Sequence, residues 1–312
     1  MSHAPLEGQR SRSLENTPVR IVSARVPLGT RLVNLWARRE LLLSLITSDI
    51  RIKYKNSTLG LFWSMVSPAF TLGVYYLVFS VFLKNGYPNF VIFLFSGLVV
   101  WNLFQSSLNT ATGVIVDRAA LVKKVSFPRE ILALSNVGAS VVYFLVQLVV
   151  LVIFVSAVQH APAWKFILIL PISFLSLYLI SAALSVVMSA VNVYLRDMRH
   201  LMEVLLQLWF WMTPIVYSYS HAIAPHLTIR GLTWVYFLNP ITLIVLTFQR
   251  VFYVNTAVHS TIAPHPIIDV LPTWSFDKFL FLNVVLLGVA IVAFFVGEAI
   301  FGRLEGEFES EL

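Results

Sequence analysis

Long apolar stretches constrain this chain more than any other feature of its sequence. Most of them are free of Asp, Glu, Lys and Arg, and most are long enough to cross the roughly 30 Å of hydrocarbon in a bilayer, which takes about 20 helical residues. They therefore predict an all-α, polytopic membrane fold with six transmembrane helices. The six runs are 59–83, 90–116, 131–158, 166–193, 204–219 and 279–297.

The basic residues lie mostly on one side of these runs. When the runs are threaded as alternating spans, 17 of the 22 Lys and Arg residues fall on the side that holds both chain ends. That side also holds the loops 117–130 and 195–201. Because Lys and Arg concentrate in cytoplasmic loops, we expect a multi-pass protein with cytoplasmic N- and C-termini.

Composition excludes several classes of protein. The chain is 58% hydrophobic and 12% charged, whereas a soluble domain carries about 25% charged residues. It has no cysteine, which excludes disulfides, thiolate metal sites and a cysteine nucleophile. The net charge of +7 does not indicate nucleic acid, since the basic residues flank membrane spans where anionic headgroups account for them.

The N-terminal region divides into two parts. Residues 1–27 are polar and rich in Ser, Pro and Arg, which predicts a disordered cytoplasmic tail. Residues 28–50 predict an amphipathic helix in the membrane interface, with Arg31 and Arg38 outside its apolar arc. The alternative is a short soluble helix that packs on a partner protein. The transmembrane domain then covers 51–304, and 305–312 form a cytoplasmic tail.

The stretch between spans five and six is unusual. Residues 220–278 are too many for a turn and too apolar for a free loop. The pair Asn239-Pro240 interrupts the second apolar run in this stretch, and Arg250 would be costly in lipid. We therefore expect a re-entrant or interfacial helical hairpin on the outer face.

The cytoplasmic loop after the second span carries a short amphipathic pattern. It reads DRAALVKKVSFPREI from Asp117 to Ile131, with Pro128 ending the predicted helix. Such a helix can fit a groove in a soluble partner and transmit its motion. The alternative is a basic loop that only fixes topology, and the pattern alone favours that alternative.

The second span contains a polar and aromatic run. Trp101, Phe104 and Gln105 share one helical face, and Ser106, Ser107 and Asn109 follow. Rings beside amides and hydroxyls suit a sugar chain, whereas the same groups also stabilise helix–helix contacts. The sequence leaves these two interpretations equal. Glu203 stands four residues after Arg199, which is typical of an ion pair at the interface.

Four motifs resemble one family of membrane proteins. They begin at Tyr54-Lys55-Asn56-Ser57-Thr58, Lys123-Lys124-Val125-Ser126-Phe127, Tyr194-Leu195-Arg196-Asp197 and Asn239-Pro240-Ile241-Thr242. In this order they are similar to motifs in the polysaccharide/polyol-phosphate export family. Members are membrane permease subunits of type-2 ABC transporters that export O-antigen, teichoic acid and related glycans.

The resemblance implies partners and roles. It implies a permease homodimer with two copies of a soluble ATP-binding subunit, which holds ATP and Mg, so that this chain binds no cofactor and no metal. The chain has no G-x-x-x-x-G-K-[ST] loop of its own. The implied ATPase-coupling residues are Asp117, Arg118, Lys123, Lys124, Phe127, Pro128, Arg129 and Glu130. The expected substrate path holds Tyr75, Trp101, Phe104, Gln105, Trp209 and Tyr217, and the implied outer gate holds Asn239, Pro240 and Arg250.

The resemblance thus implies a permease subunit that exports a lipid-linked polysaccharide across the bacterial inner membrane. Membrane lipids are further partners, and nucleic acid is not. Two alternatives remain. One is an exporter of drugs or lipids with the same fold. The other is a membrane-embedded transferase, which is disfavoured because the acids near membrane depth are isolated and the histidines lack ligand spacing.

Overall fold

The computed structural model describes most of the chain as helix. The described residues are 28–54, 63–82, 88–125, 127–229, 233–254, 257–259 and 267–311. The predicted tail 1–27 and most of the first motif lie outside them. The all-α prediction holds in these ranges except for one short antiparallel pair of strands, β1 (Ala257–His259) and β2 (Ile267–Asp269).

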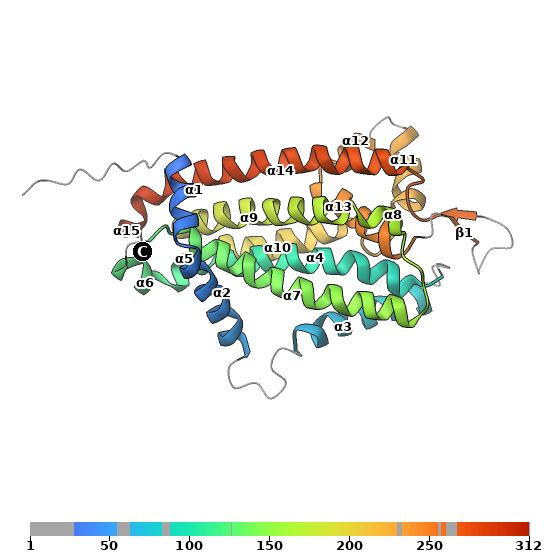
Figure 1. Cartoon of the computed structure of the whole chain (residues 1–312), viewed down its shortest axis with the longest axis horizontal. Coiled ribbons are helices and arrows are strands. Elements are labelled where there is room, and N and C mark those ends of the chain that lie inside the picture. The colour runs from blue at the N-terminus through green and yellow to red at the C-terminus, as the bar shows by residue number, and fades with distance from the viewer. Residues whose placement is uncertain are drawn as a thin grey trace, which may run out of the picture.

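Four helical segments are long and apolar enough to cross a membrane. They correspond to the second, third, fourth and sixth predicted spans, and they lie side by side in Figure 1. The segments are α4 (Phe90–Thr112), α7 (Glu130–Ala157), α8 (Trp164–Ile167) continued by α9 (Leu170–Tyr194), and α14 (Phe276–Leu304).

The first and fifth predicted spans are interrupted. The first comprises α3 (Trp63–Tyr76), with Pro68 inside it, and the π-helix η2 (Leu77–Phe82). The fifth, α10 (Met198–Trp211), ends well before position 219, where its apolar run ends. The cause is Pro214, which has no N–H to continue the helix and restricts the residue before it.

The segment after α10 folds back as short helices. It contains the π-helix η3 (Tyr219–Ile223), α11 (Ala224–Ile229), α12 (Thr233–Tyr236) and α13 (Pro240–Phe252). The start of α13 lies against α10, and its end contacts the start of α8 through a hydrogen bond from Ala163 N to Val251 O, 2.8 Å long. Most of α13 is buried, so protein encloses this helix on nearly all sides.

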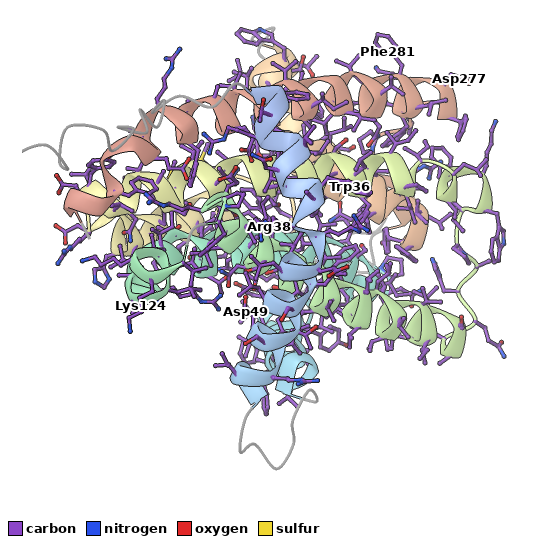
Figure 2. The ribbon with its side chains drawn as sticks, turned by 60° about the vertical axis from the view of Figure 1, so that its left-hand side comes forward. Trp36, Arg38, Asp49, Lys124, Asp277 and Phe281 are labelled. Carbon is purple, nitrogen blue, oxygen red and sulfur yellow. The ribbon has the colours of Figure 1, made fainter. Side chains whose placement is uncertain are left out.

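The N-terminal region forms two helices where the sequence predicted one. α1 (Leu28–Ala37) and α2 (Arg39–Tyr54) meet at Arg38 and cross the long helices near the end that carries α6 (Ala119–Lys124) and α15 (Phe308–Glu311) (Figures 1 and 2). Trp36 is exposed, as expected of a side chain on the apolar face of a helix that lies in the membrane interface. Arg31, which was expected on the polar face, is only 6% exposed because two carboxylates surround it.

Burial places α4 at the centre of the bundle. The apolar window of α4 is 78% buried, whereas that of α14 is 22% buried. The outward face of α14 carries exposed apolar side chains such as Phe281, Val289 and Val292, which suits contact with lipid. α4 therefore supplies the inner wall against which other helices build a site.

Candidate functional site

A cavity of about 480 Å³ lies between α3, α4 and α10. We call it the polar cavity, because aromatic rings and amides line it together. Its lining residues are Pro68, Thr71, Tyr75, Leu98, Trp101, Asn102, Gln105, Asn109, Glu203, Gln207, Phe210 and Trp211. Rings and amides in this combination bind neutral polar chains by stacking and hydrogen bonding, without a strong charge that would trap them.

The rings of this cavity hold one another in place. Tyr75 stacks on Phe210 with centroids 5.6 Å apart and an interplanar angle of 16°. Trp101 meets Phe210 edge-on at 5.5 Å, and its Nε1 donates a hydrogen bond to Gln105 Oε1 at 3.0 Å. Because the indole N–H is satisfied within α4, the ring keeps one orientation at the cavity wall.

The predicted path residues divide between the cavity and its surroundings. Tyr75, Trp101 and Gln105 line the polar cavity. Phe104 is fully buried behind it and packs edge-on against Trp209 with centroids 5.0 Å apart. Tyr217 lies outside the lining as well, where its hydroxyl donates to Trp211 O at 2.8 Å and lies 2.9 Å from the hydroxyl of Tyr236.

Nine of the twelve lining residues were not among the predicted path residues, and four of these nine come from α10. Glu203, Gln207, Phe210 and Trp211 follow one another at helical spacing on a single face of α10. That spacing was the signal that could have found them. The predicted ion pair between Arg199 and Glu203 is wrong, because the Arg199 guanidinium lies 3.5 Å from Asp117 Oδ1, whereas Glu203 Oε2 lies 3.9 Å from His200 Nδ1.

The third motif, which runs from Tyr194 through Trp209 to Thr213 and Tyr217, meets the fourth motif at the end of α10. Trp209 Nε1 donates to Asn239 Oδ1 at 2.9 Å, and Asn239 Nδ2 donates to Thr213 Oγ1 at 2.9 Å. The same Asn239 oxygen caps α13 by accepting from Ile241 N, while Pro240 occupies the first turn, where a missing N–H costs little. One asparagine therefore joins the end of α10 to the start of α13.

The predicted gate residues lie at opposite ends of α13. Asn239 and Pro240 begin this helix, and Arg250 is near its end, about 16 Å along the helix axis. The Arg250 guanidinium lies 4.8 Å from the ring centroid of Phe166 and donates a hydrogen bond to Val254 O. The three residues thus share a helix, not a single site.

The basic segment 117–130 presents charge to solvent at the end of the bundle where α1 and α2 cross. The helix in this segment is α6, which covers only Ala119–Lys124 and is shorter than the sequence predicted. Lys123 and Lys124 are exposed on it, beside Leu121 and Val125, which are 37% and 51% exposed. The segment therefore offers two charges and two apolar groups on its outer surface.

Ion pairs fix both ends of this segment to the rest of the protein. Near its start, Arg118 pairs with Asp49 of α2, which also accepts a hydrogen bond from Ser135 of α7 at 3.1 Å. At its end, Glu130 pairs with Arg31 of α1, whose Nη2 also lies 2.8 Å from Glu305 Oε2. A displacement of the segment would therefore move the N-terminal helices with it.

The remaining predicted residues of the segment lie beside these pairs. Arg129 donates to Glu305 O at 3.3 Å, and its guanidinium lies 5.9 Å from the ring centroid of Phe308. Phe127 and Pro128 are half-buried. Burial raises the pKa of Glu305, the carboxylate of Glu130 raises that pKa further, and Arg31 and Arg129 oppose the shift.

Metal ligation has no geometric support in the described ranges. Within them, no three His, Asp or Glu side chains gather in a way that could hold a metal ion. The lining of the polar cavity offers aromatic rings, amides and hydroxyls for binding.

These features define a polytopic membrane protein with a polar, aromatic cavity inside an apolar helix bundle. Residues 40–253 match the family described as ABC-2 type transporter. One curated relative is the O-antigen export system permease protein RfbA of Myxococcus xanthus, which is 32% identical over 219 residues, covering 70% of this chain and 82% of the relative. A protein of the same name from Klebsiella pneumoniae is 27% identical over 223 residues, covering 72% and 84%.

This chain belongs to the ABC-2 type transporter family. The family resemblance that its four motifs indicated is thereby confirmed. The match covers α2 to α13, so it includes the polar cavity, the basic segment 117–130 and the helix that Asn239 caps.

Proposed function

We propose that this chain is the transmembrane permease subunit of an ATP-driven exporter that moves a lipid-linked polysaccharide across the bacterial inner membrane. The observation that carries the proposal is the polar cavity, which places rings and amides inside an otherwise apolar bundle. The relatives named as O-antigen export permeases support a polysaccharide as the substrate class.

The lining chemistry fits a glycan better than a charged or wholly apolar substrate. Ring faces such as those of Tyr75 and Trp211 pack on the C–H surfaces of sugars, and the amides of Gln105 and Gln207 match hydroxyl groups. A conduit must hold a long chain weakly at many points, so that each unit can enter and leave. Neutral groups meet that requirement, and Glu203 is the one ionisable acid in the lining.

In this proposal α3 with η2 forms the first membrane crossing and α10 forms the fifth, so that the chain crosses the membrane six times. α11 to α13 form the re-entrant hairpin on the outer face. The asymmetry of Lys and Arg supports cytoplasmic termini, with α1 and α2 in the inner interface. Trp36 and Leu43 are exposed on these helices, 73% and 60%, and would contact the membrane. Asn239 and Pro240 would act at the inner end of the hairpin, and Arg250 at its outer end.

A second copy of the chain would complete the conduit. α10 carries the exposed apolar side chains Val204 and Leu208, and Met212, also exposed, caps its C-terminal end. Other residues of the same helix line the polar cavity. An apolar strip beside a polar cavity suits contact with an identical subunit across a two-fold axis. Two ATP-binding subunits would then dock on the basic segments 117–130 and hold ATP and Mg themselves.

Coupling would follow from the ion pairs at the two ends of the segment. ATP-driven movement of a docked subunit would push Lys123 and Lys124, and the pairs Arg118–Asp49 and Glu130–Arg31 would carry that movement to α2 and α1. Differential contact of the ATPase with the two permease states is what permits such a shift.

The proposal is tested by depleting the protein in cells and analysing the inner membrane. We expect a lipid-linked polysaccharide to accumulate on the cytoplasmic leaflet, and export to return when the wild-type chain is restored. Accumulation of a drug or a free phospholipid, with normal polysaccharide export, would favour the alternative exporter of the same fold. Normal levels of every such compound would refute an export role.

A further inference from the structure

A second cavity lies on another face of α3. Its volume is about 270 Å³, and its exposed surface is almost entirely apolar. Four residues of α3 form one wall, Phe95 of α4 lies behind, and α7 contributes Gln147, Val150 and Phe154. We call it the apolar cavity. Gln147 is the one residue with a polar side chain in this lining.

The two cavities share a boundary. Pro68 of α3 lines both of them. Asn102 lines the polar cavity and Gln147 lines the apolar cavity, and Asn102 Nδ2 donates a hydrogen bond to Gln147 Oε1 at 2.9 Å. The polar cavity, which suits sugars, therefore lies directly beside the apolar cavity, which suits hydrocarbon. Pro68 and the Asn102–Gln147 hydrogen bond lie between them.

The shared wall is an irregular helix. Pro68 removes one backbone hydrogen bond inside α3, and residues Leu77–Phe82 continue it as π-helix. The opposite side of this wall carries exposed apolar groups, Phe70 at 72% and Val74 at 59%. α3 thus separates the lipid surroundings from both cavities.

We infer that the apolar cavity holds the first carbons of the lipid chain of the lipid-linked glycan while the polar cavity holds its sugar end. This inference rests on the proposed function. An amphiphile of this kind cannot place its lipid among hydrated amides or its sugars in hydrocarbon, so its two halves need adjacent but different surroundings. A substrate whose head lies in the polar cavity would bring its first lipid carbons to Pro68, which borders the apolar cavity.

Adjacent residues of α7 provide a matched pair of variants. Val150 lines the apolar cavity, whereas Val149 is 58% exposed on the lipid-facing side. Val150→Trp fills the cavity, and Val149→Trp adds the same ring outside it. Both variants are purified with the ATPase partner in nanodiscs. The probes are a diazirine-bearing polyprenyl diphosphate and a diazirine-bearing phosphatidylglycerol.

We expect the polyprenyl probe to label cavity peptides in the wild type and in Val149→Trp, and to label Val150→Trp at least about fivefold less, because overpacking excludes the chain. Unlabelled lipid-linked glycan should compete with this probe on the wild-type protein, a measurement that needs no variant. The phosphatidylglycerol probe should not label these peptides more than other membrane-facing ones.

Equal labelling by both probes, or labelling that lipid-linked glycan does not reduce, would show a site for bulk lipid and overturn the inference. If the same wild-type complex exports the glycan after reconstitution into sealed vesicles, such a result leaves the proposed function standing. If the wild-type complex exports no glycan, both proposals fail.

Discussion

Arg31 and Glu130, which are 99 positions apart, form a buried ion pair with two contacts. Arg31 Nε lies 3.3 Å from Glu130 Oε1, and Nη2 lies 3.1 Å from Oε2. The two residues are 6% and 1% exposed. The pair joins α1 to the first residue of α7, at the point where the basic segment 117–130 ends. It therefore ties the proposed docking surface for the ATPase to the N-terminal helices.

Breaking this pair should destabilise the protein. Arg31→Met leaves Glu130 buried without its partner, and removing one member of a buried pair costs about 3–5 kcal/mol. Thermal unfolding of the purified protein measures the loss. The control is Arg51→Met, which changes an exposed arginine of α2. If Arg31→Met and the double variant Arg31→Met/Glu130→Gln unfold at the same temperature as Arg51→Met, the pair contributes nothing to the fold.

Charge reversal on α6 should weaken ATPase binding. Lys123→Glu with Lys124→Glu removes two exposed positive charges and adds two negative ones, which should lower affinity for the ATPase about tenfold or more. Co-purification and titration of the detergent-solubilised complex measure the change. Lys165→Glu with Lys278→Glu, at the other end of the bundle, is the control. Unchanged binding by the α6 variant would show that the basic segment only fixes the membrane topology.

Adjacent tyrosines of α3 should differ in their effect on export. Tyr75 lines the polar cavity and stacks on Phe210, whereas Tyr76 is 40% exposed away from the lining. Tyr75→Ala should lower the export rate about three- to tenfold, the range expected from losing one aromatic contact, and Tyr76→Ala should stay near the wild type. Export is measured as glycan delivered per molecule of folded protein. Equal rates for the two variants would contradict the cavity as a path.

Because the chain has no cysteine of its own, a single introduced cysteine can report membrane topology without background labelling. Lys124→Cys and Asp277→Cys place single thiols at exposed positions at opposite ends of the long helices (Figure 2). An impermeant thiol reagent added to spheroplasts should label the cysteine at 277 and leave the one at 124 unlabelled until the membrane is opened. The reverse pattern would invert the orientation that the charge asymmetry predicts.

Stability should fall as pH rises above 4.5, the ordinary pKa of a glutamate, in part because of Glu305. The pKa of this carboxyl is raised in the fold, so the folded protein holds its proton more tightly than the unfolded chain does. The contribution of Glu305 to the free energy of unfolding is therefore complete below its pKa in the unfolded chain. It is lost as pH rises through its pKa in the folded protein. Glu305→Gln should flatten that part of the stability–pH curve, measured by thermal unfolding. Glu311→Gln, at an exposed position, is the control, and equal curves for the two variants would refute the assignment.

The sequence determined the features that depend on local pattern. Apolar runs of about 20 residues or more specified α4, α7, α9 and α14, because hydrocarbon thickness fixes how long a helix must be. The Asn239-Pro240 break correctly marked the start of a separate helix, since proline's missing N–H costs little in a first turn. Four short motifs in order were enough to identify the family.

Tertiary structure decided which residues meet. On a helical wheel Arg31 belongs to a polar face, yet Glu130 and Glu305, which are far away in the sequence, make burial of its charge possible. Phe104 was grouped with Trp101, but contact with Trp209 of α10 draws it behind the cavity wall. A one-dimensional pattern records period and composition. It does not record which helix packs on which face, and that packing is what placed α3 and α10 against α4 and made the polar cavity.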